Sequence, residues 1–301
     1  MKSPDYIVWL HSILQAKGLS QTALAKELGV THATLNRWLH NKAQPHQNTI
    51  TRIYALYQQC AFYTELEKDF DPLKWQKKFS ALKNKKNLEL LNNQKDFYED
   101  SLLRLTYHTN KIEGSTLSLR ETQNILFDNQ VIAKHSLVEH LEVSNHRLAF
   151  QKMIESLQNN TPISIDFILH LHQILMTNIL TDAGQFRTHP VRIVGARVIP
   201  PNYLKVPEKM VTLCEQMEVT NDPIGILMQH AWFEAIHPFA DGNGRLGRVL
   251  LNYQLLRSEY PLIIIRSERK NIYYKTLEKA QVSQIYEPFI QFSFEELSNP
   301  C

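Results

Sequence analysis

QHAWFEAIHPFADGNGRLGRVLLNYQLL, residues 229–256, contains two helical patterns of apolar residues separated by a polar segment, HPFADGNGR, at 237–245. The chain has only nine glycines, and two of them flank one asparagine in this segment. Glycine permits backbone conformations that let successive N–H groups point into one shared space. We therefore expect two helices joined by a loop that binds an anion.

The residue types in this segment suit a nucleotide. A helix that begins near Asn243–Gly244 directs free N–H groups and the positive end of its dipole at the loop. Arg245 and Arg248 are three residues apart and share a helix face, which suits a di- or triphosphate. Asp241 is a hard ligand for Mg²⁺, and His237 can accept a proton near neutral pH. A glycine-broken helix pair with a buried histidine is the alternative, but it explains the residues poorly as a set.

HPFADGNGRLGR, residues 237–248, resembles the signature of the Fic family, His-x-Phe-x-Asp/Glu-Gly-Asn-Gly-Arg-x-x-Arg, with every fixed position present. The resemblance extends over about 100–297 and includes AGQFRT and IPP upstream and RSERKNIYY downstream. It implies an all-α fold, a Fic helical bundle with a β-hairpin flap. It also implies an enzyme that transfers AMP from ATP to a Ser, Thr or Tyr hydroxyl of a protein.

The same resemblance assigns roles to residues. His237 acts as general base on the target hydroxyl, and Asp241 holds Mg²⁺ or Mn²⁺ at the phosphates of ATP. The residues expected to bind the nucleotide are Gly242, Asn243 and Gly244 at the α-phosphate, Arg245 and Arg248 at the β- and γ-phosphates, and Tyr273 and Tyr274 at the adenosine. The family commonly has Asn seven residues after the second tyrosine, where this chain has Gln281.

The segment TDAGQFRTHPVRIVGARVIPP at 181–201 departs from helical spacing. V-R-I-V and R-V-I flank Gly195–Ala196, which predicts a short β-hairpin. By resemblance this hairpin, Val191–Ile199, is the flap that holds the target peptide by strand addition. The flap residues named for that role are Val191, Arg192, Ile193 and Val194.

TNKIEG, residues 109–114, resembles the family's inhibitory helix motif, Ser/Thr-x-x-x-Glu-Gly/Asn, whose fixed residues here are Thr109, Glu113 and Gly114. The resemblance implies that Glu113 pairs with Arg248. A carboxylate on that guanidinium takes the seat of the γ-phosphate, so ATP binds with its α-phosphate wrongly aimed. Family members with this arrangement can also remove AMP, with the glutamate orienting a water. The alternative is an exposed glutamate that ends a helix at Gly114.

LSQTALAKELGVTHATLNRWLHNKAQP, residues 19–45, has the outline of a helix-turn-helix and resembles the lambda-repressor-like family. Ser20 and Thr31 can cap the two helices, and Gly29 permits the turn. The inward residues are Leu24, Ala25, Leu28, Leu35, Trp38 and Leu39. The candidate DNA contacts are Gln21, Thr31, His32, Thr34, Asn36 and Arg37. The alternative is a helical bundle for a protein contact; six Lys/Arg against two acids in residues 1–60 favour DNA.

Length and composition set the remaining expectations. The 301 residues predict three parts: a helix-turn-helix domain at 1–60, a helical connector at 61–97, and a Fic domain at 98–297 whose inhibitory helix is 98–114. Three scattered cysteines, Cys60, Cys214 and Cys301, and no signal or membrane segment predict a soluble cytoplasmic protein. Export into another cell needs no signal of that kind and stays open. Homodimerisation is compatible with both halves.

Three functions follow from these patterns. The first is an auto-inhibited protein adenylyltransferase with a DNA-binding head, which acts on a protein near DNA or on itself. The second is a transcription regulator that uses the Fic body as a nucleotide sensor. The third is an enzyme that moves another group, such as a phosphoryl or phosphocholine moiety. The intact Gly242-Asn243-Gly244 loop and both arginines argue against the third.

Overall fold

The structure, a computed structural model, describes residues 5–16, 19–60, 70–84 and 86–299. The predicted connector at 61–97 therefore lies partly outside the described residues, as do Cys301 and the side chain of Cys60. Throughout the described ranges the secondary structure is helical, with no β-strand. The predicted all-α class is confirmed.

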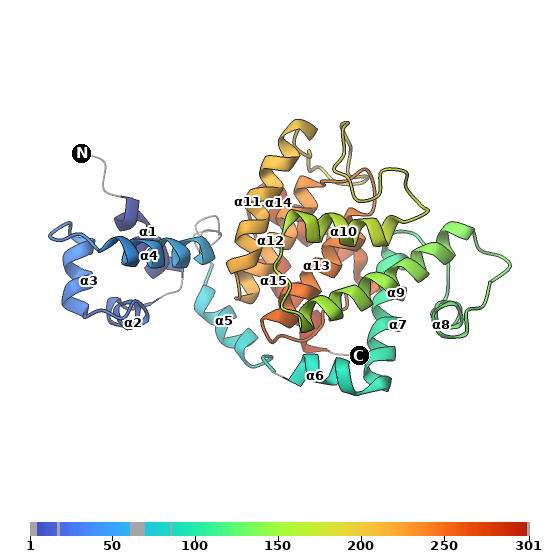
Figure 1. Ribbon diagram of the computed structural model, residues 1–301, viewed down its shortest axis with the longest axis horizontal. Coiled ribbons are helices and arrows are strands. Elements are labelled where there is room, and N and C mark those ends of the chain that lie inside the picture. The colour runs from blue at the N-terminus through green and yellow to red at the C-terminus, as the bar shows by residue number, and fades with distance from the viewer. Residues whose placement is uncertain (1–4, 17–18, 61–69, 85, 300–301) are drawn as a thin grey trace.

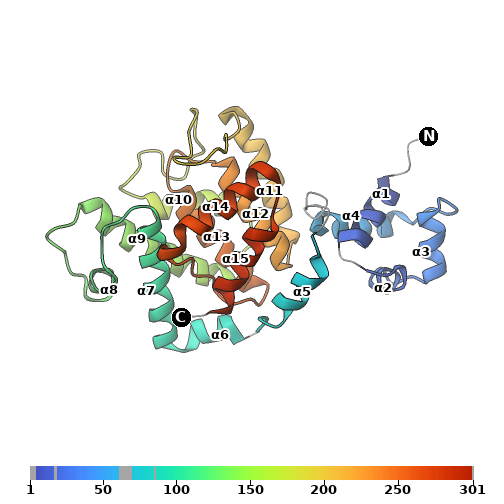
Figure 2. The same cartoon turned by 180° about the vertical axis from the view of Figure 1, so that it is seen from behind.

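The helices fall into an N-terminal group, a linking pair and a body (Figures 1 and 2). The N-terminal group is α1 (Asp5–Ala16), α2 (Gln21–Glu27), α3 (His32–Leu39) and α4 (Gln47–Cys60). The linking pair is α5 (Pro72–Ser80) and α6 (Lys86–Asn93). The body contains α7 (Lys95–Ile112), α8 (Leu119–Asp128), α9 (Leu137–Gln158), α10 (Ile165–Met176), η2 (Tyr203–Lys205), α11 (Val206–Val219), α12 (Pro223–Ile236), α13 (Asn243–Arg257), η3 (Ser267–Arg269), α14 (Lys270–Ser283) and α15 (Glu287–Ser298).

The N-terminal group forms for the reasons that its sequence indicates. The Ser20 and Thr31 hydroxyls accept hydrogen bonds from the N–H groups of Ala23 and Thr34, each at 3.2 Å, and so cap α2 and α3. Gly29 makes the turn between them with φ +69°. All six predicted inward residues are buried and pack with α1 and α4. The predicted helix-turn-helix geometry is confirmed.

The linking pair packs on the body. Trp75 and Phe79 of α5 are buried and contact Phe294 of α15, with ring centroids 5.9 and 5.3 Å away. The Trp75 indole donates to Glu287 at 3.1 Å. The described part of the predicted connector is therefore attached to the body through aromatic contacts.

Two apolar cores meet at α12 and α13. One core lies mainly among α7 to α11, and the other among α5, α14 and α15, and both take residues from α12 and α13. Nearly every side chain of α13 is buried, and so are most of α12. A helix that is enclosed on all sides cannot shift without disturbing both cores. The loop between α12 and α13 is thus held at both ends by the most enclosed helices of the body.

The β-hairpin predicted at Val191–Ile199 is wrong as a paired hairpin. The segment turns at Val194–Gly195, with Gly195 at φ +79° and the Ala196 N–H donating to the Ile193 carbonyl at 3.2 Å, but it forms no strand ladder. The apolar side chains of Val194 and Ile199 are almost fully exposed. Two strands without a third strand or a packed face are marginal in water, which accounts for the difference.

Candidate active site

The loop at 237–242 joins two helix ends by means of two left-handed residues. His237 ends α12 with φ +49°, and Gly242 precedes α13 with φ +77°. A Cβ atom on Gly242 would lie 2.6 Å from Sδ of Met176, so glycine is required there for space as well as for conformation. This geometry leaves the first N–H groups of α13 facing the loop, as the sequence predicts for an anion site.

Asn243 closes the loop on itself. Its Oδ1 accepts from the Phe239 N–H at 2.9 Å, and its Nδ2 donates to the Phe239 carbonyl at 3.0 Å. Asn243 is buried, and both ends of its amide are engaged in this backbone pair. The side chain expected at the α-phosphate therefore shapes the loop, and the backbone N–H groups are left to meet the anion.

Phe239 packs beneath the loop on a histidine that sequence analysis missed. The ring of His172 stacks on Phe239 with centroids 3.7 Å apart. Its Nδ1 accepts from the Gly184 N–H at 2.9 Å, so Nε2 is the donor to the Asp241 carbonyl at 3.0 Å. Burial lowers the pKa of His172 to about 4, which keeps this ring neutral. The only sequence signal was the second histidine of FILHLHQILM.

His237 has one ring nitrogen committed and one available. Its Nδ1 donates to the Glu234 carbonyl at 3.2 Å, which leaves Nε2 as the basic nitrogen. Burial lowers the pKa of His237, although the Glu234 carbonyl acts in the opposite direction. A neutral imidazole with a free Nε2 is the form that a general base requires.

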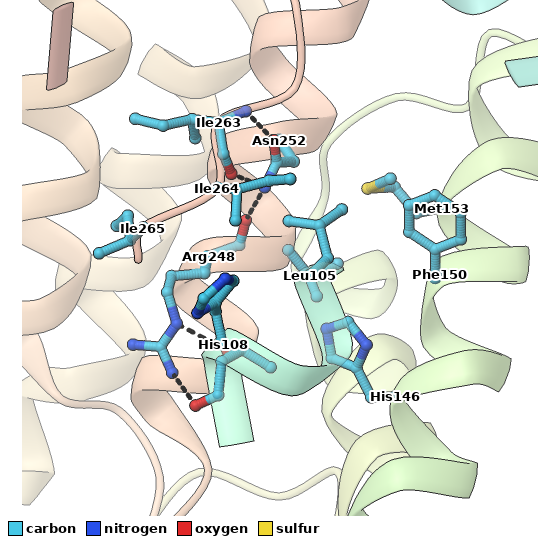
Figure 3. Close-up of a pocket in the computed structure, with 12 residues that line it drawn as sticks. Leu105, His108, His146, Phe150, Met153, Arg248, Asn252, Ile263, Ile264 and Ile265 are labelled. Carbon is cyan, nitrogen blue, oxygen red and sulfur yellow. Dashed lines mark hydrogen bonds between the residues drawn. The ribbon is translucent and has the colours of Figure 1, made fainter. Parts of the chain in front are cut away.

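Arg248 of α13 is bound by the end of α7. Its Nη2 donates to Glu113 Oε1 at 2.5 Å, its Nε donates to the Thr109 hydroxyl at 2.7 Å, and Nη2 also reaches the Thr109 carbonyl at 3.4 Å. The Thr109 contacts are drawn beside Arg248 in Figure 3. Burial alone would lower the pKa of Arg248, but the carboxylate of Glu113 raises it. The expected Glu113–Arg248 pair is present in the structure.

The motif glycines make room for this ion pair. A Cβ atom on Gly244 would lie 2.4 Å from Oε1 of Glu113, so the carboxylate sits directly over the first turn of α13. Glu113 is the C-cap residue of α7, and Gly114 follows it with φ +108°. Glu113 thus ends its helix and contacts Arg248 at the start of α13.

Arg245 is held by a glutamate that sequence analysis missed. Its Nη1 donates to Glu142 Oε1 of α9 at 2.7 Å, and its Nη2 lies 3.6 Å from Oδ1 of Asp241. The Arg245 side chain is only 5% exposed, so it meets the site through Asp241. Arg245 Nε has no hydrogen-bond partner among the described residues. Nothing in the sequence near Glu142 marked it as a partner.

Asp241, Tyr273 and Tyr274 differ in how far their side chains are exposed to a ligand. The Asp241 side chain is 63% exposed at the rim of the loop. Tyr273 lies in the core, where its hydroxyl is 2.8 Å from Nε2 of His230, whereas Tyr274 is partly exposed. Of the two tyrosines expected at the adenosine, only Tyr274 has a ring that a nucleotide can reach. Gln281 donates to the Ala231 carbonyl at 3.0 Å and thereby joins α14 to α12.

Glu234 is a buried acid beside this cluster. Its Oε1 has no hydrogen-bond partner in the described part of the chain, and a Cβ on Gly247 would lie 2.2 Å from that atom. Gly244 and Gly247 are one helical turn apart on α13, so the carboxyl groups of Glu113 and Glu234 lie along one stripe. Burial raises the pKa of Glu234 to about 7; Arg248 opposes the rise, and Glu113 adds to it.

A small cavity lies behind Arg248 (Figure 3). It is lined by residues of α7, α9 and α13 and by Ile263 to Ile265, with His108 and His146 pointing toward it. Its volume of about 20 Å³ holds about one water molecule. Nucleotide therefore does not fit there, and the open start of α13 is the candidate binding site.

The expected DNA contacts lie on the outer side of α3. Thr31, His32 and Arg37 are exposed, and Thr34 and Asn36 are partly buried. Asn36 donates to the Gln21 side chain at 3.2 Å, so the two helices present this amide pair together. In the flap segment, Arg192 and Val194 are exposed, and Val191 and Ile193 are partly buried.

Within the described residues, no group of three or more His, Cys, Asp or Glu side chains is arranged to hold a metal ion. Of the helices in the same residues, none has the length and apolar character to cross a membrane. Any metal at Asp241 would therefore take most of its ligands from substrate and water.

Comparison with known proteins identifies both parts. Residues 162–255 match the Fic/DOC family, and residues 10–58 match a helix-turn-helix model. Among curated proteins, protein adenylyltransferase fic-1 of Caenorhabditis elegans is 35% identical over 192 residues. Protein adenylyltransferase Fic of Drosophila melanogaster is 33% identical over 196 residues. Each match spans 62% of this chain and 38% of the relative, so the chain spans well under half the length of these relatives.

Solved structures agree on the fold. A fragment of C. elegans Fic-1, residues 134–508 of that protein, has a TM-score of 0.63 at 24% identity, over 99% of this chain and 97% of the fragment. A Fic domain-containing signaling protein of Bacteroides thetaiotaomicron has a TM-score of 0.62 at 22% identity, over 75% of this chain and 92% of the other. The resemblance to the Fic family, preceded by a helix-turn-helix, is confirmed.

The raised pKa of Glu234 predicts a pH-dependent stability. Between about pH 4.5 and pH 7 the folded state holds a proton that the unfolded state releases, so this group's stabilising contribution is lost as pH rises through 7. Glu234→Gln removes that loss. The variant should gain about 3 kcal/mol relative to wild type between pH 5 and pH 8.

Urea unfolding at both pH values measures this difference. Glu218→Gln, which alters an acid paired with Arg257 whose pKa is lowered, serves as the control and should show no such gain over this pH range. A Glu234→Gln gain equal at pH 5 and pH 8 contradicts the prediction.

Proposed function

We propose that this chain is an auto-inhibited protein adenylyltransferase that transfers AMP from ATP to a Ser, Thr or Tyr hydroxyl of a protein. The observation that carries the proposal is the carboxylate of Glu113 on Arg248 at the start of α13. A buried arginine beside free helix N–H groups is suited to polyphosphate, and a carboxylate there competes for the same place. The names of the relatives, protein adenylyltransferases, support AMP as the group transferred.

The transfer uses His237 as the base. The target hydroxyl attacks the α-phosphorus of ATP, a new P–O bond forms, the bond to the β-phosphate breaks, and pyrophosphate leaves. The hydroxyl proton goes to Nε2 of His237, because Nδ1 already donates to the Glu234 carbonyl. Holding the imidazole by this contact also sets the direction from which it receives the proton.

The start of α13 stabilises the charge that grows on the phosphates. The Gly242 N–H donates to Oδ1 of Asp241 at 2.6 Å, whereas the N–H groups of the first turn of α13, from Asn243 onward, face the loop and need no rearrangement when the reaction occurs. Arg248 adds a full positive charge once Glu113 has left it. Asp241, exposed at the rim, fits Mg²⁺ or Mn²⁺, which commonly bind through one carboxylate plus substrate phosphates and water. Such an ion would neutralise phosphate charge during transfer.

The brake acts by occupation of one guanidinium. Glu113 and Thr109 together take the Nε and Nη2 donors of Arg248, so the γ-phosphate must displace the carboxylate to reach them. A nucleotide that binds without this displacement is aimed differently, and a small misplacement of reacting atoms lowers the rate steeply. In the same position Glu113 can orient a water that attacks the AMP–protein bond, which releases AMP and restores the hydroxyl.

Glu113→Gly is expected to raise transfer by at least tenfold, because Arg248 then has no competing carboxylate. Incorporation of label from α-labelled ATP into protein, with Mg²⁺ or Mn²⁺ present, measures the rate, and intact mass identifies the group and reports self-modification. Glu155→Gly, which changes an exposed acid of α9 paired with Lys152, is the matched control. Equal or lower incorporation by Glu113→Gly than by wild type contradicts the brake.

His237→Ala in the Glu113→Gly background is expected to abolish transfer, by at least 10²-fold, because no other described side chain holds a basic nitrogen at this point of the loop. Nucleotide affinity, measured by titration with a fluorescent ATP analogue, should change by less than threefold. An alanine variant that still transfers AMP would remove His237 from its assigned role.

We also propose that the N-terminal group binds DNA, because α3 presents an exposed Arg37 and a Gln21–Asn36 amide pair on its outer side. Arg37→Ala should weaken binding to a random-sequence duplex. It should also reduce the slope of log K against log salt concentration by about the amount that corresponds to one phosphate contact. Fluorescence anisotropy at several salt concentrations measures both.

Lys152→Ala on α9 of the body is the control for this measurement and should change neither value. Absence of any binding by wild type at low salt would favour the protein-contact interpretation of the helix-turn-helix. DNA binding without labelled protein product, even for Glu113→Gly, would favour a transcription regulator that senses nucleotide.

A further inference from the structure

Arg187 lies between α10 and the flap segment and is almost completely buried. Its guanidinium donates hydrogen bonds to four backbone carbonyls. Nε donates to His237 at 2.8 Å, Nη1 to His189 at 3.1 Å, and Nη2 to Pro201 at 2.6 Å and Ile236 at 3.4 Å. A buried charge is costly unless its donors are satisfied, and here they are satisfied by main chain.

The four carbonyls belong to two different parts of the site. Those of Ile236 and His237 stand at the end of α12, where helix carbonyls lack partners and the dipole is negative. Those of His189 and Pro201 stand at the two ends of the flap segment. The Arg187 guanidinium therefore joins both ends of the flap segment to the backbone of His237.

The backbone of Arg187 strengthens this connection. Its N–H donates to the Pro238 carbonyl at 2.9 Å, so residue 187 holds the loop on both sides of the His237 peptide unit. The flap itself lacks a strand ladder, and its turn at Val194–Gly195 is exposed. Arg197 ties the second limb of the flap to Glu278 of α14 through its N–H at 3.1 Å and its Nε at 2.9 Å. The two ends of the flap are held relative to His237 by Arg187.

We propose that Arg187 is a positioning residue for the transfer reaction: its guanidinium sets the segment that receives the target protein in register with His237. The inference rests on the proposed function, in which an extended target segment lies along the flap. The hydroxyl of that segment must reach Nε2 of His237 while it faces the α-phosphate. Loss of the clamp leaves the nucleotide seat on α13 intact but displaces the hydroxyl from the base.

Two substitutions in the Glu113→Gly background separate geometry from charge. Arg187→Lys keeps the charge but cannot reach four carbonyls with one ammonium group, and Arg187→Met removes both. For both variants we expect kcat/KM for the protein target to fall by ten- to a hundredfold, with affinity for a fluorescent ATP analogue changed by less than threefold.

The pH profile provides a readout that a purely structural role would not move. The charge of Arg187 contributes to lowering the pKa of His237, after burial. Activity rises as His237 loses its proton, so Arg187→Met should shift the acidic limb of the pH–rate profile to higher pH. Arg187→Lys should leave that limb in place. Arg120→Met, an exposed arginine of α8, is the matched control and should change neither the kinetics nor the profile.

Each outcome decides the proposal. The proposal is supported if both variants have a lower kcat/KM for the protein target and keep their affinity for nucleotide. It also requires that only Arg187→Met shifts the acidic limb of the pH–rate profile. Unchanged target kinetics, or an equal loss of nucleotide affinity and target kinetics, overturns it, as would failure of both variants to fold. If the Glu113→Gly parent transfers no nucleotide to any protein, the proposed function fails instead, and the two failures are thereby distinguished.

Discussion

The site depends on one constraint, which is that α13 begins inside the protein. A helix leaves its first N–H groups without internal partners, and burying such an end requires groups that accept from them. Two left-handed residues, His237 and Gly242, and the Asn243 amide give the loop a shape that leaves these N–H groups open. An anion is the partner that both the N–H groups and the helix dipole favour. The proposed phosphate site, the position of the proposed base and the proposed inhibitory contact all depend on this buried helix start.

In the proposed function, competition for Arg248 links the proposed phosphate site to regulation. Thr109 and Glu113 meet the same guanidinium, and Gly244 lets the carboxylate come close to the helix. Glu234 lies one helical turn further along the same face of α13. Two acids that differ in exposure to solvent are therefore close to Arg248. The exposed acid is the one that can move, and the buried acid keeps a raised pKa. Glu113 is therefore the acid that contacts Arg248, and Glu234 acts on the arginine only through its charge.

Sequence analysis predicted those parts of the site that lie in short local patterns. HPFADGNGR identified the loop, and Ser20 and Thr31 identified the helix caps, because spacing along a helix determines which side chains share a face. The contact of Glu113 with Arg248 was predicted only from the resemblance of TNKIEG to the inhibitory motif of the Fic family. It missed His172, Glu142 and Arg187, which act through contacts with residues 50 or more positions away. It also predicted a paired hairpin where only a turn forms, because propensity does not reveal whether a strand finds a neighbour. Asn243 and Tyr273 were assigned to the ligand, but burial commits them to the protein.

The unequal burial of the two partners in the Glu113–Arg248 pair has a mechanical consequence. Arg248 belongs to a helix enclosed by both cores, whereas Glu113 stands one residue beyond the last residue of α7, where its N–H reaches the Thr109 carbonyl at a long 3.4 Å. Helix ends fray at far lower free energy than enclosed helices open. Opening the pair therefore amounts to unwinding a final half-turn of α7, with the arginine as the fixed anchor. The N–H groups of Gly114 and Ser115 donate to the Lys111 and Asn110 carbonyls at 3.2 and 3.0 Å, so release of the arginine would require these two hydrogen bonds to open as well.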